Sequence, residues 1–207
     1  MQDSQDDLGF VHRFVPAERP GRAPLLLLHG TGGNESDLIP LGLQLSPGAA
    51  LLSPRGKILE NGMPRFFRRR AEGVFDMEDL SAQTEALGAF LESARERYAL
   101  AKPVAVGFSN GANIAWSLML ARPGALAGAI LMRGMMPFEP AHRAKLDGLR
   151  VLVLNGGMDP IAPAETHERI VKVLREAGAD VRHEILPAGH QLTRQDLALA
   201  AEWLAQR

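Results

Sequence analysis

The sequence predicts an α/β fold with a mostly parallel central sheet and helices on both of its faces. Short, almost wholly aliphatic runs recur along the 207 residues, and such runs are typical of strands buried on both faces. Amphipathic stretches of helical length separate them, as expected when helices connect parallel strands. There is no repeat and no obvious linker, so we expect one domain over residues 1–207.

The predicted strands are apolar runs bounded by turn residues. Phe10–Val15 is expected to form an edge strand. The remaining strands are expected at Leu25–Leu28, Ala49–Ser53, Val104–Gly107, Ala129–Met132, Val151–Asn155 and Arg182–Leu186. Since each intervening helix joins two parallel strands, right-handed crossovers are expected.

Apolar spacing and end signals predict the helices. Apolar or small residues recur every three or four positions over Asp79–Tyr98, which places them on one helical face. The pattern returns over Ile170–Ala177, and Gly178 is a plausible C-terminal stop. The last helix starts with a capping-box pattern, Thr193-Arg-Gln-Asp196.

One segment does not fit this alternation. Residues Arg55–Met77 contain three glycines, a proline and a run of arginines. We expect a long surface excursion near the strand ends, and long loops of this kind are often functional.

The segment Gly107-Phe-Ser109-Asn-Gly111 matches the nucleophile motif G-x-S-x-G. It follows a predicted strand and precedes good helix material, Ala112–Ala121, which is the context that the motif requires. Ser109 is therefore the candidate nucleophile, and the backbone N–H of Asn110 can donate to a developing oxyanion. The alternative is a chance Gly-Ser-Gly turn.

A serine nucleophile needs a base, and His190 is the best placed of the six histidines. It follows the last predicted strand, whereas His167 lies in a predicted helix and His183 within a strand. The alternative for His190 is an ordinary surface histidine. The acid should lie between serine and histidine in the chain.

Asp159 is the candidate acid, in Gly156-Gly-Met-Asp159-Pro160 after another aliphatic strand. Its role would be to orient the imidazole and stabilise the imidazolium. The alternative is a helix cap or an Asx-turn before Pro160. Asp180 and Glu184 are rivals that are less well placed.

A second oxyanion donor is expected after an early strand. His29-Gly-Thr31-Gly-Gly33 follows Leu25–Leu28, so the donor is assigned to the backbone N–H of Thr31. His29 is expected to shape this loop. The glycines match neither the P-loop pattern nor the dinucleotide-binding pattern, so they do not predict a nucleotide site.

Composition narrows the function classes. The 23 Lys and Arg nearly balance the 24 Asp and Glu, which gives no reason to expect nucleic acid or an anionic membrane as partner. With no cysteine, disulfides, thiolate catalysis and Cys-ligated zinc are excluded, and no metal is expected. The absence of cysteine favours a reducing cytoplasm, and the polar start and short aliphatic runs predict neither a secretion signal nor membrane insertion.

These motifs together resemble the phospholipase/carboxylesterase family of α/β hydrolases, which includes the acyl-protein thioesterases. The resemblance covers the chain from about Leu25 to the end. Its segments are His29-Gly-Thr-Gly-Gly-Asn-Glu-Ser-Asp37, Leu52-Ser-Pro-Arg-Gly56, Gly107–Gly111, Gly156–Pro160 and Gly189-His190. Asn61-Gly-Met-Pro-Arg-Phe-Phe-Arg68 is similar to the small bacterial MhqD-like esterases.

The resemblance implies an α/β-hydrolase fold without a large cap domain, and hydrolysis of carboxylic esters or thioesters without a cofactor. It also implies a Ser109–His190–Asp159 triad. Two departures weaken a protein-depalmitoylase or lysophospholipid assignment. Ser109-Asn-Gly-Ala112 stands where the thioesterases carry Ser-Gln-Gly-Gly, and Arg133-Gly134 stands where a Ser-Gly pair is usual.

We therefore expect a carboxylesterase for small or medium soluble esters. A thioesterase, a lysophospholipase-type enzyme and a non-catalytic ligand-binding module remain alternatives, and Met135 and Met136 are the candidate surface for a homodimer. The candidate substrate contacts are Arg65, Phe66, Arg133 and Met135. The apolar members could equally cover the core, and the arginines, including the cluster Arg65–Arg70, could be solvated or ion-paired.

Overall fold

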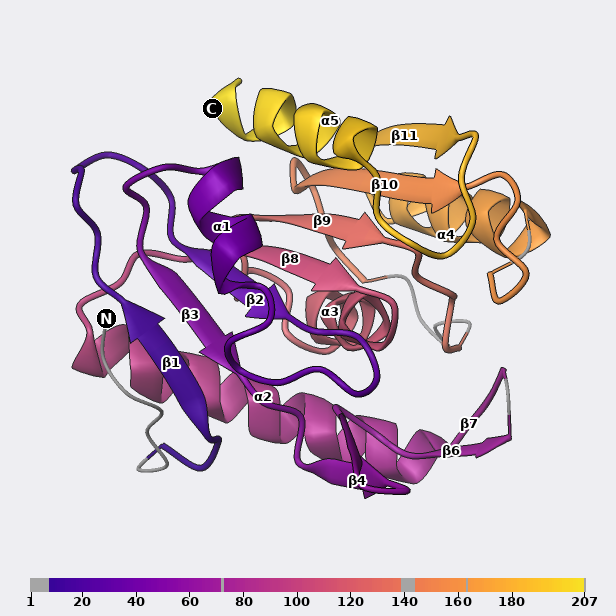
Figure 1. Cartoon of the computed structure of the whole chain (residues 1–207), viewed down its shortest axis with the longest axis horizontal. Coiled ribbons are helices and arrows are strands. Elements are labelled where there is room, and N and C mark those ends of the chain that lie inside the picture. Colours follow the sequence, from indigo (N-terminus) through magenta and orange to yellow (C-terminus); the bar gives the residue numbers. More distant parts are fainter. Residues whose placement is uncertain (1–7, 72, 139–143, 163, 207) are drawn as a thin grey trace.

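The computed structural model describes residues 8–71, 73–138, 144–162 and 164–206. Within them, seven strands form one sheet with the order β1-β3-β2-β8-β9-β10-β11 (Figure 1). Only β1 runs antiparallel to its neighbour, and the other pairs are parallel. The strands are β1 (His12–Val15), β2 (Leu25–Leu28), β3 (Leu51–Pro54), β8 (Val104–Phe108), β9 (Gly128–Met132), β10 (Arg150–Gly156) and β11 (Asp180–Leu186).

The predicted fold class is confirmed. Each of the seven sheet strands coincides with a predicted one, with ends that differ by at most two residues. The predicted edge strand is β1, which pairs with β3 alone. The parallel pairs also require the helical connections that the sequence predicts.

Helices cover both faces of the sheet (Figure 1). One apolar cluster joins the sheet to α2 (Met77–Arg97), α3 (Asn110–Ala121) and α4 (Ala164–Glu176). A second cluster, on the other face, includes α1 (Ile39–Leu45) and α5 (Arg194–Ala205). Helix α1 is not predicted from the sequence, because seven residues that include Pro40 and Gly42 give little helical signal.

Strand β2 illustrates why these runs are central strands. Leu26 and Leu28 belong to the cluster of α2, α3 and α4, whereas Leu25 and Leu27 belong to the opposite cluster. Alternate side chains of a strand point to opposite faces, so only a strand covered on both faces can bury four successive leucines. Full burial stabilises the fold by roughly 1.5–3 kcal/mol for each leucine.

The predicted helix-end signals are present. At α5, the side chain of Thr193 accepts a hydrogen bond from the backbone N–H of Asp196, and the Asp196 carboxylate accepts one from the backbone N–H of Thr193. At the end of α4, Gly178 has a positive φ of 90°, a conformation that glycine adopts without steric penalty.

The segment Arg55–Met77 is more ordered than the surface excursion that the sequence predicts. It contains the hairpins β4–β5 and β6–β7, and between them Phe66 and Phe67 are 1% and 0% exposed. The four short strands are β4 (Ile58–Glu60), β5 (Met63–Arg65), β6 (Arg69–Ala71) and β7 (Val74–Phe75). The segment is held against the core because the burial of two adjacent phenylalanine side chains is strongly favourable.

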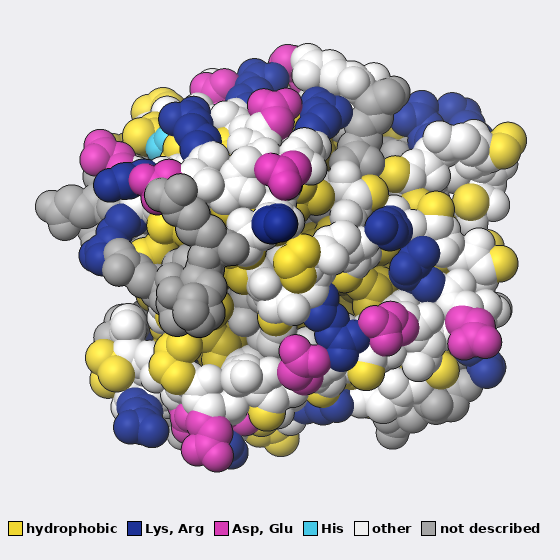
Figure 2. Space-filling view, turned by 180° about the vertical axis from the view of Figure 1, so that it is seen from behind, with side chains coloured by type: hydrophobic (Ala, Val, Ile, Leu, Met, Phe, Trp, Pro, Cys, Tyr) yellow, Lys and Arg dark blue, Asp and Glu magenta, His cyan; other side chains and the backbone are white. Residues whose placement is uncertain are grey.

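One face of the molecule carries charges of both signs. On the face shown in Figure 2, Lys and Arg side chains are interspersed with Asp and Glu. No helix in the described part of the chain is sufficiently long and apolar to cross a membrane.

Candidate active site

Ser109 lies at the sharp turn between β8 and α3. Its φ and ψ of 52° and −115° are strained for a residue with a side chain. The turn is held because the backbone N–H of Ser109 donates to the carbonyl of Met132 on β9 (2.9 Å) and its carbonyl accepts from Asn113 N–H (3.1 Å). The strand–turn–helix context that the motif requires is therefore present.

The side chain of Ser109 meets those of His190 and Asp159. His190 lies on the loop after β11, and its Nε2 is 3.0 Å from Ser109 Oγ. Its Nδ1 is 2.8 Å from Oδ2 of Asp159, which lies on the loop after β10. The His190 side chain is 18% exposed and that of Asp159 is fully buried, so the imidazole faces solvent on one side and a fixed acceptor on the other.

The carboxylate of Asp159 both contacts His190 and forms a turn with the residues that follow it. While Oδ2 faces His190, Oδ1 accepts hydrogen bonds from the backbone N–H groups of Ile161 (2.9 Å) and Ala162 (3.3 Å). The bond to Ile161 is the Asx-turn that was the alternative to an acid role. The two are compatible, since the turn fixes the carboxylate and leaves one oxygen for the imidazole.

Two residues of the cleft carry the backbone amides that the sequence predicts as oxyanion donors. Thr31 and Asn110 line the same cleft as Ser109. Among the hydrogen bonds between described residues, neither backbone N–H has an acceptor, while the amides of Gly32 and Gly33 bond to the carbonyls of Pro64 and Gly30. This arrangement suits stabilisation of a negative oxygen beside the serine.

His29 holds the Thr31 loop in place, as expected from the sequence. Its Nδ1 is 2.7 Å from the carbonyl of Gly30, and its Nε2 accepts a hydrogen bond from the backbone N–H of Gly56 (2.9 Å). The Nδ1–H tautomer of a neutral imidazole satisfies both bonds. Burial lowers the pKa of His29, which favours this neutral form.

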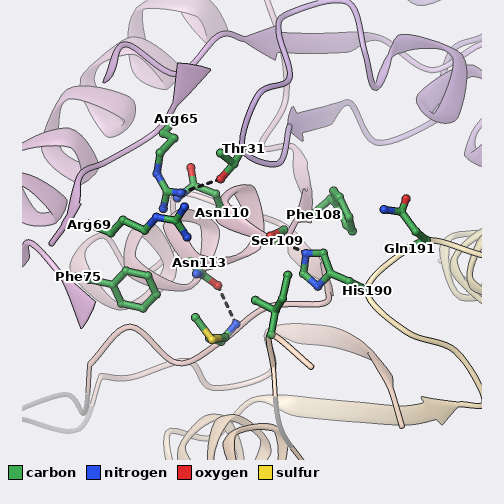
Figure 3. A pocket seen from close by; sticks show the side chains of 12 residues that line it. Thr31, Arg65, Arg69, Phe75, Phe108, Ser109, Asn110, Asn113, His190 and Gln191 are labelled. Atoms are coloured by element: carbon green, nitrogen blue, oxygen red, sulfur yellow. Dashed lines mark hydrogen bonds between the residues drawn. The ribbon is translucent and has the colours of Figure 1, made fainter. Parts of the chain in front are cut away.

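The cleft has a volume of about 310 Å³ and combines polar and apolar walls. In Figure 3, Arg69 and Phe75 lie on one side of Ser109, and Gln191 lies on the other. The cleft is lined by Thr31, Arg65, Arg69, Phe75, Phe108, Ser109, Asn110, Asn113, Met135, Ile161, His190 and Gln191. Within the described residues, no group of three or more His, Asp or Glu side chains could hold a metal ion.

The arginines of the cleft wall are tied to their surroundings. Arg65 donates to the side-chain oxygen of Thr31 (2.8 Å) and contacts Glu60 (3.4 Å). Arg69 pairs with the same Glu60 at 2.9 Å, and the two arginines lower the pKa of Glu60, chiefly through its hydrogen bond with Arg69. Two guanidinium groups therefore lie side by side on this wall, both in contact with the carboxylate of Glu60.

Two of the four expected substrate contacts lie elsewhere. Arg65 and Met135 line the cleft, whereas Phe66 and Arg133 do not. Phe66 is in the core, with its ring 4.7 Å from that of His29. The Arg133 side chain is 0% exposed and forms an ion pair with Asp196. The expectation for these two residues is corrected, because apolar burial and a buried carboxylate place them inside the protein.

Two asparagines of α3 contribute contacts that the sequence analysis missed. The side-chain oxygen of Asn110 accepts from the backbone N–H of Phe66 (2.7 Å), and that of Asn113 accepts from Met135 N–H (2.8 Å). The available signal was their spacing, because residues three apart share a helical face. Phe75, Phe108, Ile161 and Gln191 of the cleft were also missed, whereas Arg69 belongs to the arginine cluster that the sequence offered as a possible contact for an acidic substrate group.

Comparison with known proteins agrees with the fold described above. Residues 12–207 match the model of the family described as Phospholipase/Carboxylesterase. The MhqD protein of Bacillus subtilis strain 168, named as a hydrolase, is 45% identical over 181 residues, which cover 86% of this chain and 90% of that protein.

Solved structures are similar over almost their whole length. A Bacillus cereus carboxylesterase has a TM-score of 0.95 at 43% identity, with 98% of this chain and 96% of the other covered. A Mesorhizobium loti carboxylesterase has a TM-score of 0.93 at 34% identity, with 99% and 98% covered. A structure of YahD with malic acid has a TM-score of 0.89 at 32% identity, with 94% and 98% covered.

Proposed function

The chain belongs to the phospholipase/carboxylesterase family, and from this membership we propose that it hydrolyses carboxylic esters of small or medium soluble substrates through an acyl-enzyme on Ser109. The observation that supports the proposal most directly is the continuous series of contacts from Ser109 Oγ to His190 and on to Asp159, at 3.0 and 2.8 Å. These distances lie within the range required for proton transfer between nucleophile and base.

In the first half-reaction, Ser109 Oγ attacks the ester carbonyl carbon while its proton moves to Nε2 of His190. The carbonyl oxygen becomes negative and accepts hydrogen bonds from the amides of Thr31 and Asn110. The C–O bond to the alcohol then breaks, and the alcohol leaves with the proton from His190. Each oxyanion donor is expected to lower the barrier by roughly 3 kcal/mol.

In the second half-reaction, water takes the place of the alcohol. His190 removes a proton from the water, whose oxygen attacks the acyl carbon, and Ser109 leaves with the proton that His190 returns. The Asp159 carboxylate holds Nδ1–H in the required tautomer throughout. The hydrogen bonds that Oδ1 accepts from Ile161 and Ala162 support this role, since they fix the orientation of the carboxylate.

The same proposal extends to the substrate. The wall formed by Arg65 and Arg69 favours an ester that carries a carboxylate, because guanidinium groups match the geometry of carboxylates. The related YahD has a structure with malic acid, a dicarboxylic acid. Arg69 is the better candidate for a direct contact, since its side chain is 25% exposed and that of Arg65 only 3%.

If Arg69 contacts a substrate carboxylate, its removal should raise KM for a negatively charged ester but not for a neutral one. Arg69→Gln should raise KM for a p-nitrophenyl hemisuccinate several-fold and leave KM for p-nitrophenyl butyrate nearly unchanged, since one exposed ionic contact contributes about 1 kcal/mol or less. Arg70→Gln serves as the matched control, because Arg70 is not among the residues that line the cleft. Equal KM changes for both esters would contradict a carboxylate contact.

Labelling with a fluorophosphonate tests the nucleophile. Wild type and the control Ser117→Ala should be labelled, and Ser109→Ala should not. Undiminished labelling of Ser109→Ala would refute the assignment.

A panel of oxygen esters and thioesters with the same acyl group then tests the bond cleaved, and a clear preference for thioesters would identify a thioesterase instead. The cytoplasmic location expected from the sequence is part of the proposal and is tested by cell fractionation.

A further inference from the structure

We propose that Arg133 is a positioning residue that holds the loop of His190 in the orientation that Ser109 requires. This inference rests on the proposed function, in which His190 is the base. Arg133 directly follows β9, and its guanidinium reaches the loop after β11. There its Nε–H donates to the carbonyl of Gly189 (2.9 Å) and an Nη2–H donates to that of Gln191 (3.2 Å). These carbonyls belong to the residues immediately before and after His190.

All five N–H donors of the guanidinium fit a defined set of acceptors. Besides the two loop carbonyls, Nη1 donates to the carbonyl of Leu154 on β10 (3.2 Å), and the two terminal nitrogens lie 2.8 Å from the two carboxylate oxygens of Asp196. A guanidinium has five donors in a fixed plane and a lysine ammonium has three. The site therefore uses a property of arginine that lysine lacks.

Asp196 neutralises the positive charge and fixes its position. Its carboxylate also accepts hydrogen bonds from the backbone N–H (2.7 Å) and hydroxyl (2.8 Å) of Thr193 at the start of α5. Arg133 thus joins the ends of β9 and β10 and the start of α5 to the histidine loop. The backbone N–H of Ser109 donates to the carbonyl of Met132, the residue before Arg133. The end of β9 therefore positions both the nucleophile and the loop of the base.

The backbone at Arg133 supports a positioning role. Its φ is +54°, a left-handed conformation that favours glycine or asparagine and is strained for arginine. A buried ion pair is in itself weak evidence for stabilisation, because desolvation offsets most of the attraction. Stability alone therefore does not account for a strained arginine whose contacts lie on both sides of His190.

The decisive variant keeps the fold while it removes the loop contacts. Arg133→Met/Asp196→Asn replaces the ion pair with neutral groups and retains a side-chain oxygen at 196 for the cap of α5. We expect its kcat for p-nitrophenyl acetate to fall about 10- to 100-fold with KM within about two-fold, since a misplacement of about 1 Å can lower the rate by that factor. The single variant Arg133→Lys keeps the positive charge but not the five donors, so its kcat should remain nearly as low as that of the double variant.

A second measurement distinguishes positioning from general destabilisation. Adding a low, non-denaturing concentration of guanidinium chloride should restore part of the kcat of Arg133→Ala, whereas sodium chloride should not. Phe90→Leu, a core change in α2, is the control for lost stability and should keep the wild-type kcat at temperatures where it is folded. Wild-type kcat in the folded double variant, or no rescue by guanidinium, would overturn the inference.

Parallel assays of Ser109→Ala and His190→Ala keep the two proposals distinct. If wild-type hydrolysis does not depend on these side chains, the proposed function fails. If it does depend on them while the Arg133 variants retain wild-type kcat, only the positioning role fails.

Discussion

The α-carbon of Gly111 packs directly against the backbone carbonyl of Leu28, so closely that a β-carbon at position 111 would overlap the carbonyl oxygen. Leu28 ends β2, and the loop that carries Thr31 follows it. Gly111 lies in the first turn of α3, two residues after Ser109. The distance between the nucleophile and one proposed oxyanion donor therefore depends on the absence of a side chain at this crossing.

Gly111→Ala is expected to displace the start of α3 from β2. Because a β-carbon cannot fit beside the Leu28 carbonyl, the backbone must shift, and we expect fluorophosphonate labelling and kcat to fall by about 100-fold or more. The overpacked site should also lower the free energy of unfolding by about 1–3 kcal/mol. Labelling rates and urea unfolding measure the two effects.

Gly88→Ala is the matched control for this substitution. Gly88 is also a helical glycine, but the nearest atoms to its added β-carbon belong to the flexible side chain of Arg122. Alanine has the higher helix propensity, by about 1 kcal/mol, which offsets the displaced side chain. Wild-type activity in Gly111→Ala would show that the crossing does not position the nucleophile.

Asp159→Asn tests the role of the acid separately from its structural role. An asparagine oxygen can still accept the hydrogen bonds from Ile161 and Ala162, so we expect the fold to remain stable. Its amide would face Nδ1 of His190 as a donor and favour the wrong imidazole tautomer, which in a comparable triad lowers kcat by about 10⁴-fold.

The control for Asp159→Asn is Asp147→Asn, at a carboxylate outside the cleft. It should keep the wild-type kcat. A decrease of less than about tenfold in Asp159→Asn would be too small for an acid that orients the base, and would leave residue 159 with the Asx-turn alone.

The sheet and the three site loops could be predicted because their signals are local. Four successive leucines at Leu25–Leu28 require a strand covered on both faces. Parallel strands end at the same edge of a sheet, so residues that follow them, such as Ser109, Asp159 and His190, are expected to converge there. Chain order and the G-x-S-x-G motif then assign each residue a chemical role.

The positions of Phe66 and Arg133 could not be predicted, because they depend on contacts between segments that are distant in the sequence. Whether Phe66 faces substrate or core depends on neighbours such as His29 and Asn110, which are 37 and 44 residues away in the numbering. Arg133 pairs with Asp196, 63 residues further along the chain, and the capping box already gave Asp196 a local explanation, so no local signal indicates the pair. Periodicity cannot reveal such pairs.

Asn113→Ala is expected to weaken substrate binding more than chemistry. Asn113 Oδ1 accepts from the backbone N–H of Met135, and both residues line the cleft. Loss of this bond frees the Met135 loop, so we expect KM to rise about 3- to 10-fold with kcat little changed, in keeping with a hydrogen bond worth about 1 kcal/mol. Steady-state kinetics with a butyrate ester provide the measurement.

Ser117→Ala is the corresponding control on the same helix. It removes a buried hydrogen bond with Thr84 (2.8 Å) that faces α2 rather than the cleft. A similar KM in both variants would mean that the change in Asn113→Ala reflects helix stability and not the loop.

Stability is expected to decline with acid in part through His167, a fully buried side chain in α4. Burial, helped by the nearby His183, lowers the pKa of His167 from 6.5 to about 4. The unfolded chain therefore binds this proton more readily than the folded protein, and the free energy of unfolding falls as the pH drops from about 6.5 towards 4, by up to about 3 kcal/mol for this residue.

In urea titrations, His167→Leu should flatten that part of the dependence of the free energy of unfolding on pH. The control Val171→Ala, on the same helix, should lower the free energy of unfolding equally at all pH values. An unchanged slope in His167→Leu would assign the acid sensitivity to other groups, such as His29 and His183, whose pKa values burial also lowers.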